Sequence, residues 1–305
     1  MSDLRVGYLP TLYHTSYILK SGGWLEKSSG LKVDWELYPT GPAMTKAFSE
    51  HKIDIGYIGL PPAMIAIDKG NPIICVGGGH VEGTIMLAPK HYKTLEELGD
   101  VKKVLEQFSG KKIGTPSQGS IHDVIIRNLL EEQGVKGVTV RNYEWAEFLP
   151  EALENGEIDA AVGTPSLIVA ASRQIDVHLV IPPNKLWPNN PSYGIVIREE
   201  LKETTHVILE FLKMHKKACT LIRENPGKAA KLVSKEIKGL NPEFVKATYT
   251  ISPKYCAALS PQYITSTLAF VPILKKLGYI KKILGEKEVF ETSYIEKIHP
   301  EPPHY

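Results

Sequence analysis

Several features that would assign this chain to a common protein class are missing from its 305 residues. No stretch approaches the roughly 18 uninterrupted apolar residues of a membrane-spanning helix, so we expect no insertion into a membrane. Neither sign of charge dominates, because 36 Lys and Arg stand against 34 Asp and Glu, a net charge of +2. Nucleic-acid binding requires a strongly basic surface, and we therefore exclude nucleic acid as a partner.

Cysteines and catalytic motifs are also scarce. Cys75, Cys219 and Cys256 form neither a C-x-x-C pair nor a zinc-like cluster, and we expect three buried, small, hydrophobic side chains. The chain contains no H-E-x-x-H or G-x-S-x-G motif, and its histidines lack metal-ligand spacing. These absences predict no catalytic residue, no metal and no cofactor.

The amino-terminal segment lacks the features of an export signal. From Met1 the sequence enters a strand-like run directly, without a basic region, an apolar region or a small-residue cleavage site. It also lacks a lipid-anchor motif. The sequence as written is that of a cytoplasmic protein, or of an exported protein whose signal has been removed.

Strand-like and helical segments alternate through the first two thirds of the chain, which is typical of α/β proteins with helix-covered parallel sheets. A chain of this length exceeds what one hydrophobic core usually supports, so we expect two lobes. After Glu199 the pattern becomes helical, over 206–223, 226–237, 242–249 and 261–277. The predicted strands are 4–9, 33–37, 53–59, 73–77, 84–88, 112–115, 138–143, 158–163, 177–181 and 193–197.

Two segments about a hundred residues apart repeat one plan. Each has a helix, a strand that begins Ile-Asp, and a Gly/Pro turn, in 47–61 and again in 152–165. His51 in the first copy stands where Gly156 stands in the second, so we expect both to end their helices in a left-handed conformation. Ligands of open α/β sheets bind beyond the carboxyl ends of strands, where these turns lie.

The segments 22–26, 109–116 and 119–134 add a helix end, a strand and a further helix to these features. Taken in this order and spacing, the features resemble the substrate-binding proteins of nitrate, sulfonate and taurine transport, and the related thiamine-pyrimidine binding and synthase proteins. The resemblance extends from the first strand to about Ile237. It implies a two-lobed periplasmic-binding-protein type II fold, with a ligand cleft between the lobes and two crossings. The implied lobes are 1–87 with 193–305, and 88–192. The segments that carry the resemblance are 4–9, 22–26, 48–62, 109–116, 119–134 and 152–165.

In the second lobe, the strongest candidate for ligand binding is the loop 115–122. Gly119 and Ser120 lead from a strand into a helix whose free N–H groups would suit a carboxylate, sulfonate or phosphate. The resemblance implies an anion there, and His122 would add a charge or a hydrogen bond. The alternative is that Ser120 only caps the helix and that His122 faces solvent.

In the first lobe, three turns follow the first three strands. They contain Thr11, Tyr13 and His14, then Thr40 and Gly41, and then Gly59 and Pro61. We expect them to open on one edge and to provide donors and an aromatic wall for a small molecule. Tyr13 could equally pack against the first helix.

Four further residues complete the predicted site. His80 follows three glycines that would permit close approach of a ligand, although the run lacks the spacing and the lysine of a phosphate-binding loop. His80 would either face the cleft or end the strand. Trp145 and Thr164 are the candidates from the second lobe, with Trp145 equally suited to a core. Tyr193 lies at the second crossing.

We therefore predict a monomeric solute-binding protein that closes over a small anionic or heteroaromatic ligand. The resemblance implies an ABC-type permease as partner and a periplasmic or cell-surface location. The alternatives are a cytoplasmic enzyme of the pyrimidine-synthase kind, an intracellular ligand sensor, and a regulatory or scaffolding module. The enzyme's cysteine-rich run has no counterpart in this chain.

Overall fold

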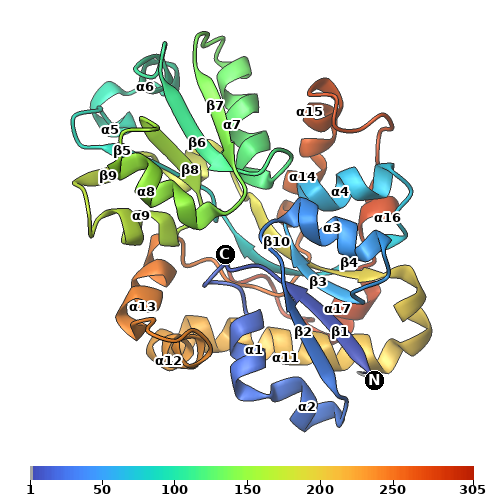
Figure 1. Cartoon of the computed structure of the whole chain (residues 1–305). Helices are drawn as coiled ribbons and strands as arrows, with labels where there is room; N and C mark the ends of the chain where they lie inside the picture. Colours follow the sequence, from blue (N-terminus) through green and yellow to red (C-terminus); the bar gives the residue numbers. More distant parts are fainter. Residues whose placement is uncertain (1–2) are drawn as a thin grey trace.

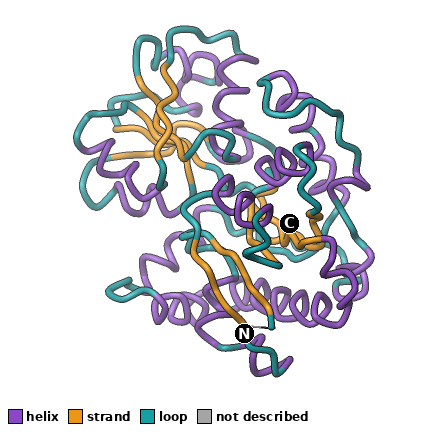
Figure 2. Tube along the Cα trace, turned by 45° about the vertical axis from the view of Figure 1, so that its right-hand side comes forward, coloured by secondary structure: helices purple, strands orange, loops and turns teal. Residues whose placement is uncertain are grey.

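The computed structural model describes residues 3–305 and contains two separate five-stranded sheets (Figures 1 and 2). The first sheet has the strand order β2-β1-β3-β10-β4 and the second has β7-β6-β8-β5-β9. We call each sheet with its helices the first and the second lobe. The strands are β1 (Leu4–Tyr8), β2 (Val33–Leu37), β3 (Ile55–Ile58), β4 (Ile73–Val81), β5 (Ile85–Pro89), β6 (Lys112–Pro116), β7 (Thr139–Tyr143), β8 (Ala160–Gly163), β9 (Val177–Ile181) and β10 (Pro191–Arg198).

Each sheet combines parallel strands with a strand that belongs to a crossing. β1 is parallel to β2 and β3, and β6 is parallel to β7 and β8, whereas β10 and β5 are antiparallel to their neighbours. The chain passes to the second sheet between β4 and β5 and returns between β9 and β10. The predicted two-lobed fold with two crossings is confirmed, while the boundaries 1–87, 88–192 and 193–305 stay a prediction.

Helices cover both sheets, and those after β10 pack mainly on the first lobe. The long helix α11 (Thr205–Glu224) runs beneath this lobe in Figure 1 and buries Ile208, Phe211 and Leu212. The predicted helix 261–277 is divided at Ala269. The other helices are α1 (Ser16–Gly22), α2 (Trp24–Ser29), α3 (Gly41–Ser49), α4 (Leu60–Asp68), α5 (Leu95–Leu98), α6 (Val101–Glu106), α7 (Ile121–Glu132), η1 (Ala146–Phe148), α8 (Leu149–Glu154), α9 (Ser166–Ala171), α10 (Pro183–Leu186), η2 (Glu199–Thr204), α12 (Pro226–Glu236), α13 (Pro242–Ile251), α14 (Pro261–Leu268), α15 (Phe270–Lys276), α16 (Glu286–Val289) and α17 (Ser293–Ile298).

The two copies of the repeat have the same local structure. His51 and Gly156 both adopt the left-handed conformation, with φ of 53° and 68°. In each copy the next N–H donates a 2.9 Å bond back into the helix, to the carbonyl of Ala47 or of Ala152. The prediction that His51 ends its helix as Gly156 does is therefore confirmed.

The aspartates of the two Ile-Asp pairs fix the starts of the neighbouring strands. Asp54 Oδ2 accepts a 2.9 Å bond from the N–H of Arg5 in β1, and Asp159 Oδ2 accepts a 3.0 Å bond from the N–H of Lys112 in β6. Asp54 also binds the guanidinium groups of Arg5 and Arg198. Each repeat thus anchors the amino end of a neighbouring strand, β1 or β6. The carboxyl end of that strand lies at the other end of the sheet.

The three glycines before His80 do not make room for a ligand. They lie inside β4, where the chain's own groups approach them closely. A Cβ on Gly78 would lie 2.3 Å from the carbonyl oxygen of Ala258, and one on Gly79 would lie 2.2 Å from the ring of Tyr193. The expected close approach is therefore made by Tyr193 and Ala258, and His80 continues the strand instead of ending it.

The two crossings are bonded to each other. The N–H of Glu82 donates a 2.7 Å bond to the carbonyl of Asn190, and the N–H of Asn189 donates to Glu82 Oε1 at 3.2 Å. Glu82 and Asn189 are both left-handed, with φ of 62° and 52°, which is uncommon for residues other than glycine. The two connections between the lobes are therefore held together by hydrogen bonds.

The cysteines are buried and free, as predicted. Burial raises the pKa of Cys75 to about 12 and moves that of Cys219 still higher. Among residues 3–305, no helix is both long and apolar enough to cross a membrane.

Candidate functional site

A small cavity of about 50 Å³ lies where the two lobes meet. Its wall is formed mainly by residues at or after the carboxyl ends of β1, β2, β3, β6, β7 and β8, with Ser192 added from β10. Both sheets therefore open on the cavity, as parallel sheets usually open on ligands. The residues at the wall are Leu9, Pro10, Thr11, Tyr13, His14, Pro39, Thr40, Gly41, Gly59, Pro62, Pro116, Ser120, Ile121, His122, Ala146, Glu147, Thr164 and Ser192.

The lobes are closed over this cavity. Gly59 at the start of α4 lies so near α7 that a Cβ on it would be 3.5 Å from the side chain of Ile121. The same Cβ would lie 3.6 Å from the carbonyl oxygen of Ser192. The small volume therefore belongs to a closed arrangement.

The start of α7 supplies hydrogen-bond donors at the cavity. Ser120 caps the helix, because its hydroxyl accepts a 3.3 Å bond from the N–H of Asp123. Within the described residues, the N–H groups of Ile121 and His122 have no partner. The start of α4 offers fewer donors, since its second and third residues are Pro61 and Pro62. The α7 terminus thus presents the wall with free N–H groups of the kind that suit an anion.

His122 is neutral at pH 7. It is buried, and burial lowers its pKa to about 4. Its Nδ1 lies 3.0 Å from Thr84 Oγ1, which accepts a 2.8 Å bond from Asn190 Nδ2. The Thr84 hydroxyl can therefore donate to Nδ1, which leaves Nε2 as the N–H donor of the ring. Of the two roles predicted for His122, the structure favours a hydrogen bond over a charge.

On the side of the first lobe, the cavity is lined by the ring of Tyr13 and the imidazole of His14. Tyr13 and His14 are both buried, and the His14 ring lies 4.0 Å from the ring of Tyr193. Burial, followed by the neighbouring histidines, lowers the pKa of His14 well below its usual value. His14 Nδ1 has no hydrogen-bond partner among the described residues, so a buried polar atom is available at the wall.

Five predicted residues lie outside the wall. His80 is held behind it, with Nε2 2.6 Å from the carbonyl of Ser252 and Nδ1 2.9 Å from the hydroxyl of Ser192. Tyr193 is fully buried in β10. Pro61 belongs to α4 but not to the wall, and Trp145 immediately precedes the wall residues Ala146 and Glu147. Gly119 lies at a second, separate cavity.

Sequence reasoning missed two polar residues of the wall, Glu147 and Ser192. Desolvation raises the pKa of the Glu147 carboxyl group, although the residue as a whole is exposed to solvent. Ser192 Oγ accepts a 2.6 Å bond from the N–H of Gly83 and links the wall to His80. Among the described residues of the wall, none is Lys or Arg. Glu147 follows no recognisable motif, but its place two residues after Trp145 was a usable signal.

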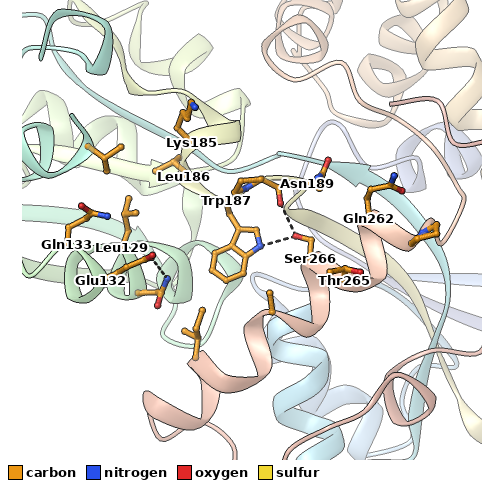
Figure 3. Close-up of a pocket in the computed structure, with 16 residues that line it drawn as sticks. Leu129, Glu132, Gln133, Lys185, Leu186, Trp187, Asn189, Gln262, Thr265 and Ser266 are labelled. Atoms are coloured by element: carbon orange, nitrogen blue, oxygen red, sulfur yellow. Dashed lines mark hydrogen bonds between the residues drawn. The ribbon is translucent and has the colours of Figure 1, made fainter. Parts of the chain in front are cut away.

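A larger, open groove of about 740 Å³ lies elsewhere between the lobes, around Trp187 (Figure 3). Trp187 stacks on Phe270 with ring centroids 3.9 Å apart and donates a 2.9 Å bond to Ser266 Oγ. Figure 3 shows the bond from Trp187 to Ser266, which joins the second crossing to α14. None of the predicted site residues lines this groove. The smaller cavity is the better candidate because strand ends and helix α7 converge there.

Comparison with known sequences identifies relatives across most of the chain. The sequence model of the NMT1-like family matches residues 1–235. A provisionally named binding protein of Brucella abortus (strain 2308) is 25% identical over 244 residues, which are 77% of this chain and 72% of that protein. A provisionally named aliphatic sulfonates-binding protein of Bacillus subtilis (strain 168) is 22% identical over 306 residues, covering 97% of this chain and 88% of that protein.

Solved structures show the same fold. The ligand-binding component of an ABC-type import system from Staphylococcus aureus, with zinc bound, has a TM-score of 0.80 at 14% identity and covers 98% of this chain and 99% of that one. The alkanesulfonate-binding protein of Xanthomonas axonopodis, bound to MOPS, has a TM-score of 0.77 at 20% identity and covers 94% and 97%. The predicted type II fold and the predicted family resemblance are confirmed.

Proposed function

This chain belongs to the NMT1-like family, and from that membership we propose that it is a solute-binding protein of an ABC-type import system. It captures a small ligand in the cavity between its lobes and presents the closed form to a permease. The names of its relatives support this proposal, since they include an aliphatic sulfonates-binding protein and a component of an ABC-type import system.

The observation that carries the proposal is the free start of α7 opposite the Tyr13–His14 wall. A helix amino terminus favours negative charge, and the N–H groups of Ile121 and His122 are available to bind oxygen atoms. The described wall residues include no lysine or arginine that could pair with an anion. The backbone donors are therefore the groups that would bind it. The preferred ligand is therefore a small molecule with a sulfonate, carboxylate or similar anionic group.

Closure provides the mechanism. Donors from α7 belong to the second lobe, whereas Thr11, His14 and Thr40 belong to the first. A ligand that touches both walls makes all its contacts only in the closed state, so binding shifts the population towards closure. A permease that recognises both lobes in this arrangement would distinguish the loaded protein from the empty one.

Glu147 favours a second ligand class. Its carboxyl group, whose pKa is raised by desolvation, lies at the same cavity as the aromatic ring of Tyr13. A heteroaromatic ring with an amino group would stack on Tyr13 and donate to Glu147. This class includes thiamine-type pyrimidines. A zwitterion with an amine and an anionic group would bind both Glu147 and the α7 terminus.

The enzyme alternative has less support from the described residues. A cysteine-dependent reaction requires an accessible thiolate, but Cys75 and Cys219 are buried with raised pKa values. We therefore retain the binder as the proposal, acting as a monomer at a periplasmic or cell-surface location, with the lobes 1–87 plus 193–305 and 88–192.

The proposal is tested by the thermal unfolding of the purified protein with added ligands. Methanesulfonate, taurine, nitrate, acetate and an aminopyrimidine are compared at equal ionic strength, and any hit is measured by calorimetry. A specific ligand raises the melting temperature with its concentration. Replacing Ser120 by Trp blocks the α7 terminus and abolishes the shift, whereas Ser172→Trp on the exposed end of α9 retains it. The absence of any shift with all five compounds contradicts the proposal.

A further inference from the structure

Three side chains that bind metals in other proteins meet in the first lobe, away from the cleft. Cys256 Sγ lies 3.3 Å from His299 Nε2 and 3.3 Å from His304 Nδ1, and the two nitrogens are 3.3 Å apart. Cys256 and His299 are buried, whereas His304 is exposed. The three atoms therefore form a compact, nearly equilateral triangle that solvent reaches from one side.

The three residues come from two parts of the chain. Cys256 lies between α13 and α14, in a segment joined to β4 by backbone hydrogen bonds. One of them is the 3.1 Å bond from the N–H of Cys256 to the carbonyl of Gly79. His299 directly follows α17, and His304 lies in the C-terminal segment. His299 and His304 are only five positions apart, but Cys256 lies 43 positions before His299, so the sequence alone does not connect the cysteine with the two histidines.

The hydrogen bonds of His299 prepare Nε2 to act as a ligand. Its Nδ1 lies 3.0 Å from the carbonyl oxygen of Glu301, and because a carbonyl only accepts, Nδ1 carries the proton. The lone pair of the neutral ring is then on Nε2, which points at Cys256 Sγ. Histidines that bind metals commonly donate their other N–H to such a carbonyl, which fixes both the tautomer and the ring orientation.

Hydrogen bonds alone satisfy this triangle poorly. Three close contacts join the three atoms, but His299 Nε2 carries no proton, so only the thiol and the His304 Nδ1–H remain as donors. One of the three contacts therefore has no proton between its two atoms. A cation bound to all three atoms would use every lone pair at once.

The dimensions match a tetrahedral zinc site. With Zn–N bonds of about 2.05 Å and a Zn–S bond of about 2.3 Å, tetrahedral geometry puts two nitrogens about 3.3 Å apart and sulfur about 3.6 Å from each. The observed separations of 3.3 Å need little adjustment. We propose that Cys256, His299 and His304 bind one Zn²⁺ ion through Sγ, Nε2 and Nδ1. Thiolate and imidazole are ligands that zinc prefers over calcium or magnesium.

The fourth position is open to water or to Glu301. Glu301 Oε1 lies 3.6 Å from His299 Nε2 but pairs with Lys216 of α11. The zinc ion would fasten the segment 299–304 to the segment that supports β4, next to His80. The site thus stabilises the first lobe and takes no part in the cleft, so it stands or falls independently of the proposed transport function.

The test measures metal binding by the full chain in the presence of a non-thiol reductant. Protein stripped with a chelator is loaded with Zn²⁺, freed of excess metal and analysed for zinc. We expect about one ion per chain. Loading with Co²⁺ instead should give tetrahedral d–d bands and a thiolate-to-cobalt charge-transfer band, which reports coordination by the cysteine.

Three variants identify the ligands. Cys256→Ser should abolish the charge-transfer band, and His304→Ala should weaken Zn²⁺ binding by more than the roughly 10- to 100-fold that loss of a supporting partner costs. His304 is exposed, so its replacement leaves the core intact. Cys219→Ser, which changes a buried cysteine outside the group, should retain both properties. Failure to retain zinc, or equal retention by wild type and His304→Ala, overturns the proposal.

Discussion

Tyr279 Oη donates a 2.8 Å hydrogen bond to Asp123 Oδ2, and this bond joins the C-terminal part of the first lobe to α7 in the second. Asp123 is fully buried and also accepts bonds from Gly119, Arg127 and Asn142. The carboxylate is therefore fixed within its own lobe, and only the bond from Tyr279 depends on closure.

Tyr279→Phe should weaken ligand binding without reducing stability much. A hydrogen bond to a charged group contributes about 1.5–3 kcal/mol, so loss of this bond from the closed state should lower affinity about tenfold or more. Calorimetry with the best ligand measures the change. Tyr143→Phe is the matched control, because the Tyr143 hydroxyl has no partner among the described residues. Equal losses in both variants would contradict this role of Tyr279.

Gly59→Leu should hold the lobes apart. A Cβ at Gly59 already reaches van der Waals contact with Ile121, so the longer leucine side chain would occupy the interface between α4 and α7. Small-angle scattering should then show that saturating ligand no longer reduces the radius of gyration. Gly59→Ala is the control, since its Cβ fits at 3.5 Å and closure should persist. Normal closure of the leucine variant would exclude the contact as a closure surface.

Stability should fall as the pH drops from 6.5 to 4. Burial lowers the pKa of His80, His122 and His215 to about 4, and that of His14 is also lowered. In this window the unfolded chain binds protons that the folded protein does not, so the free energy of unfolding decreases by up to about 1.4 kcal/mol per histidine per pH unit. Urea denaturation at several pH values measures the slope.

The origin of that slope is tested by variants. In His215→Gln the amide can still donate to the carbonyl of Gly78, which His215 Nε2 contacts at 2.6 Å. The variant should reduce the slope by the contribution of one titrating histidine. His206→Gln, at an exposed position, should leave it unchanged. Asp54 contributes only near the acidic end of this window, because its carboxyl group protonates around pH 3.8 in the unfolded chain and at a lower pH in the folded protein. A slope unaltered by His215→Gln would assign the protons to other groups.

The two aspartates of the repeat should differ in their effect on stability. Asp54→Asn leaves Arg5 and Arg198 without their shared carboxylate and should cost about 2–3 kcal/mol. Asp159→Asn loses bonds from Lys112 N–H and Tyr92 Oη at a more exposed site and should cost about 1 kcal/mol. Chemical denaturation of both variants compares them directly. Equal costs would mean that the two arginines add nothing.

Local signals in the sequence predicted the strands well because short apolar runs between turn residues leave few alternatives. Strands 33–37 and 177–181 agree with β2 and β9 to the residue. The exception was β4, which continues through its glycines because Tyr193 and Ala258 pack against them. Such contacts join residues more than a hundred positions apart and leave no local pattern.

The candidate cavity was predictable only where a turn follows a strand. Thr11, Thr40 and Ser120 fit that rule, and the structure brings them to one wall. Ser192 does not fit it, because it reaches the wall from the crossing strand β10. Which of these residues touch ligand stays a prediction for the binding experiments above.

The bonds between Glu82, Asn189 and Asn190 have a mechanical consequence. Two independent linkers would let the lobes twist as well as open. Linkers that are hydrogen-bonded to each other act as a single hinge. Opening then follows a single arc. One pair of fluorescent labels placed across the cleft would report the whole movement, and the protein could serve as a sensor in which occupancy is read as one distance.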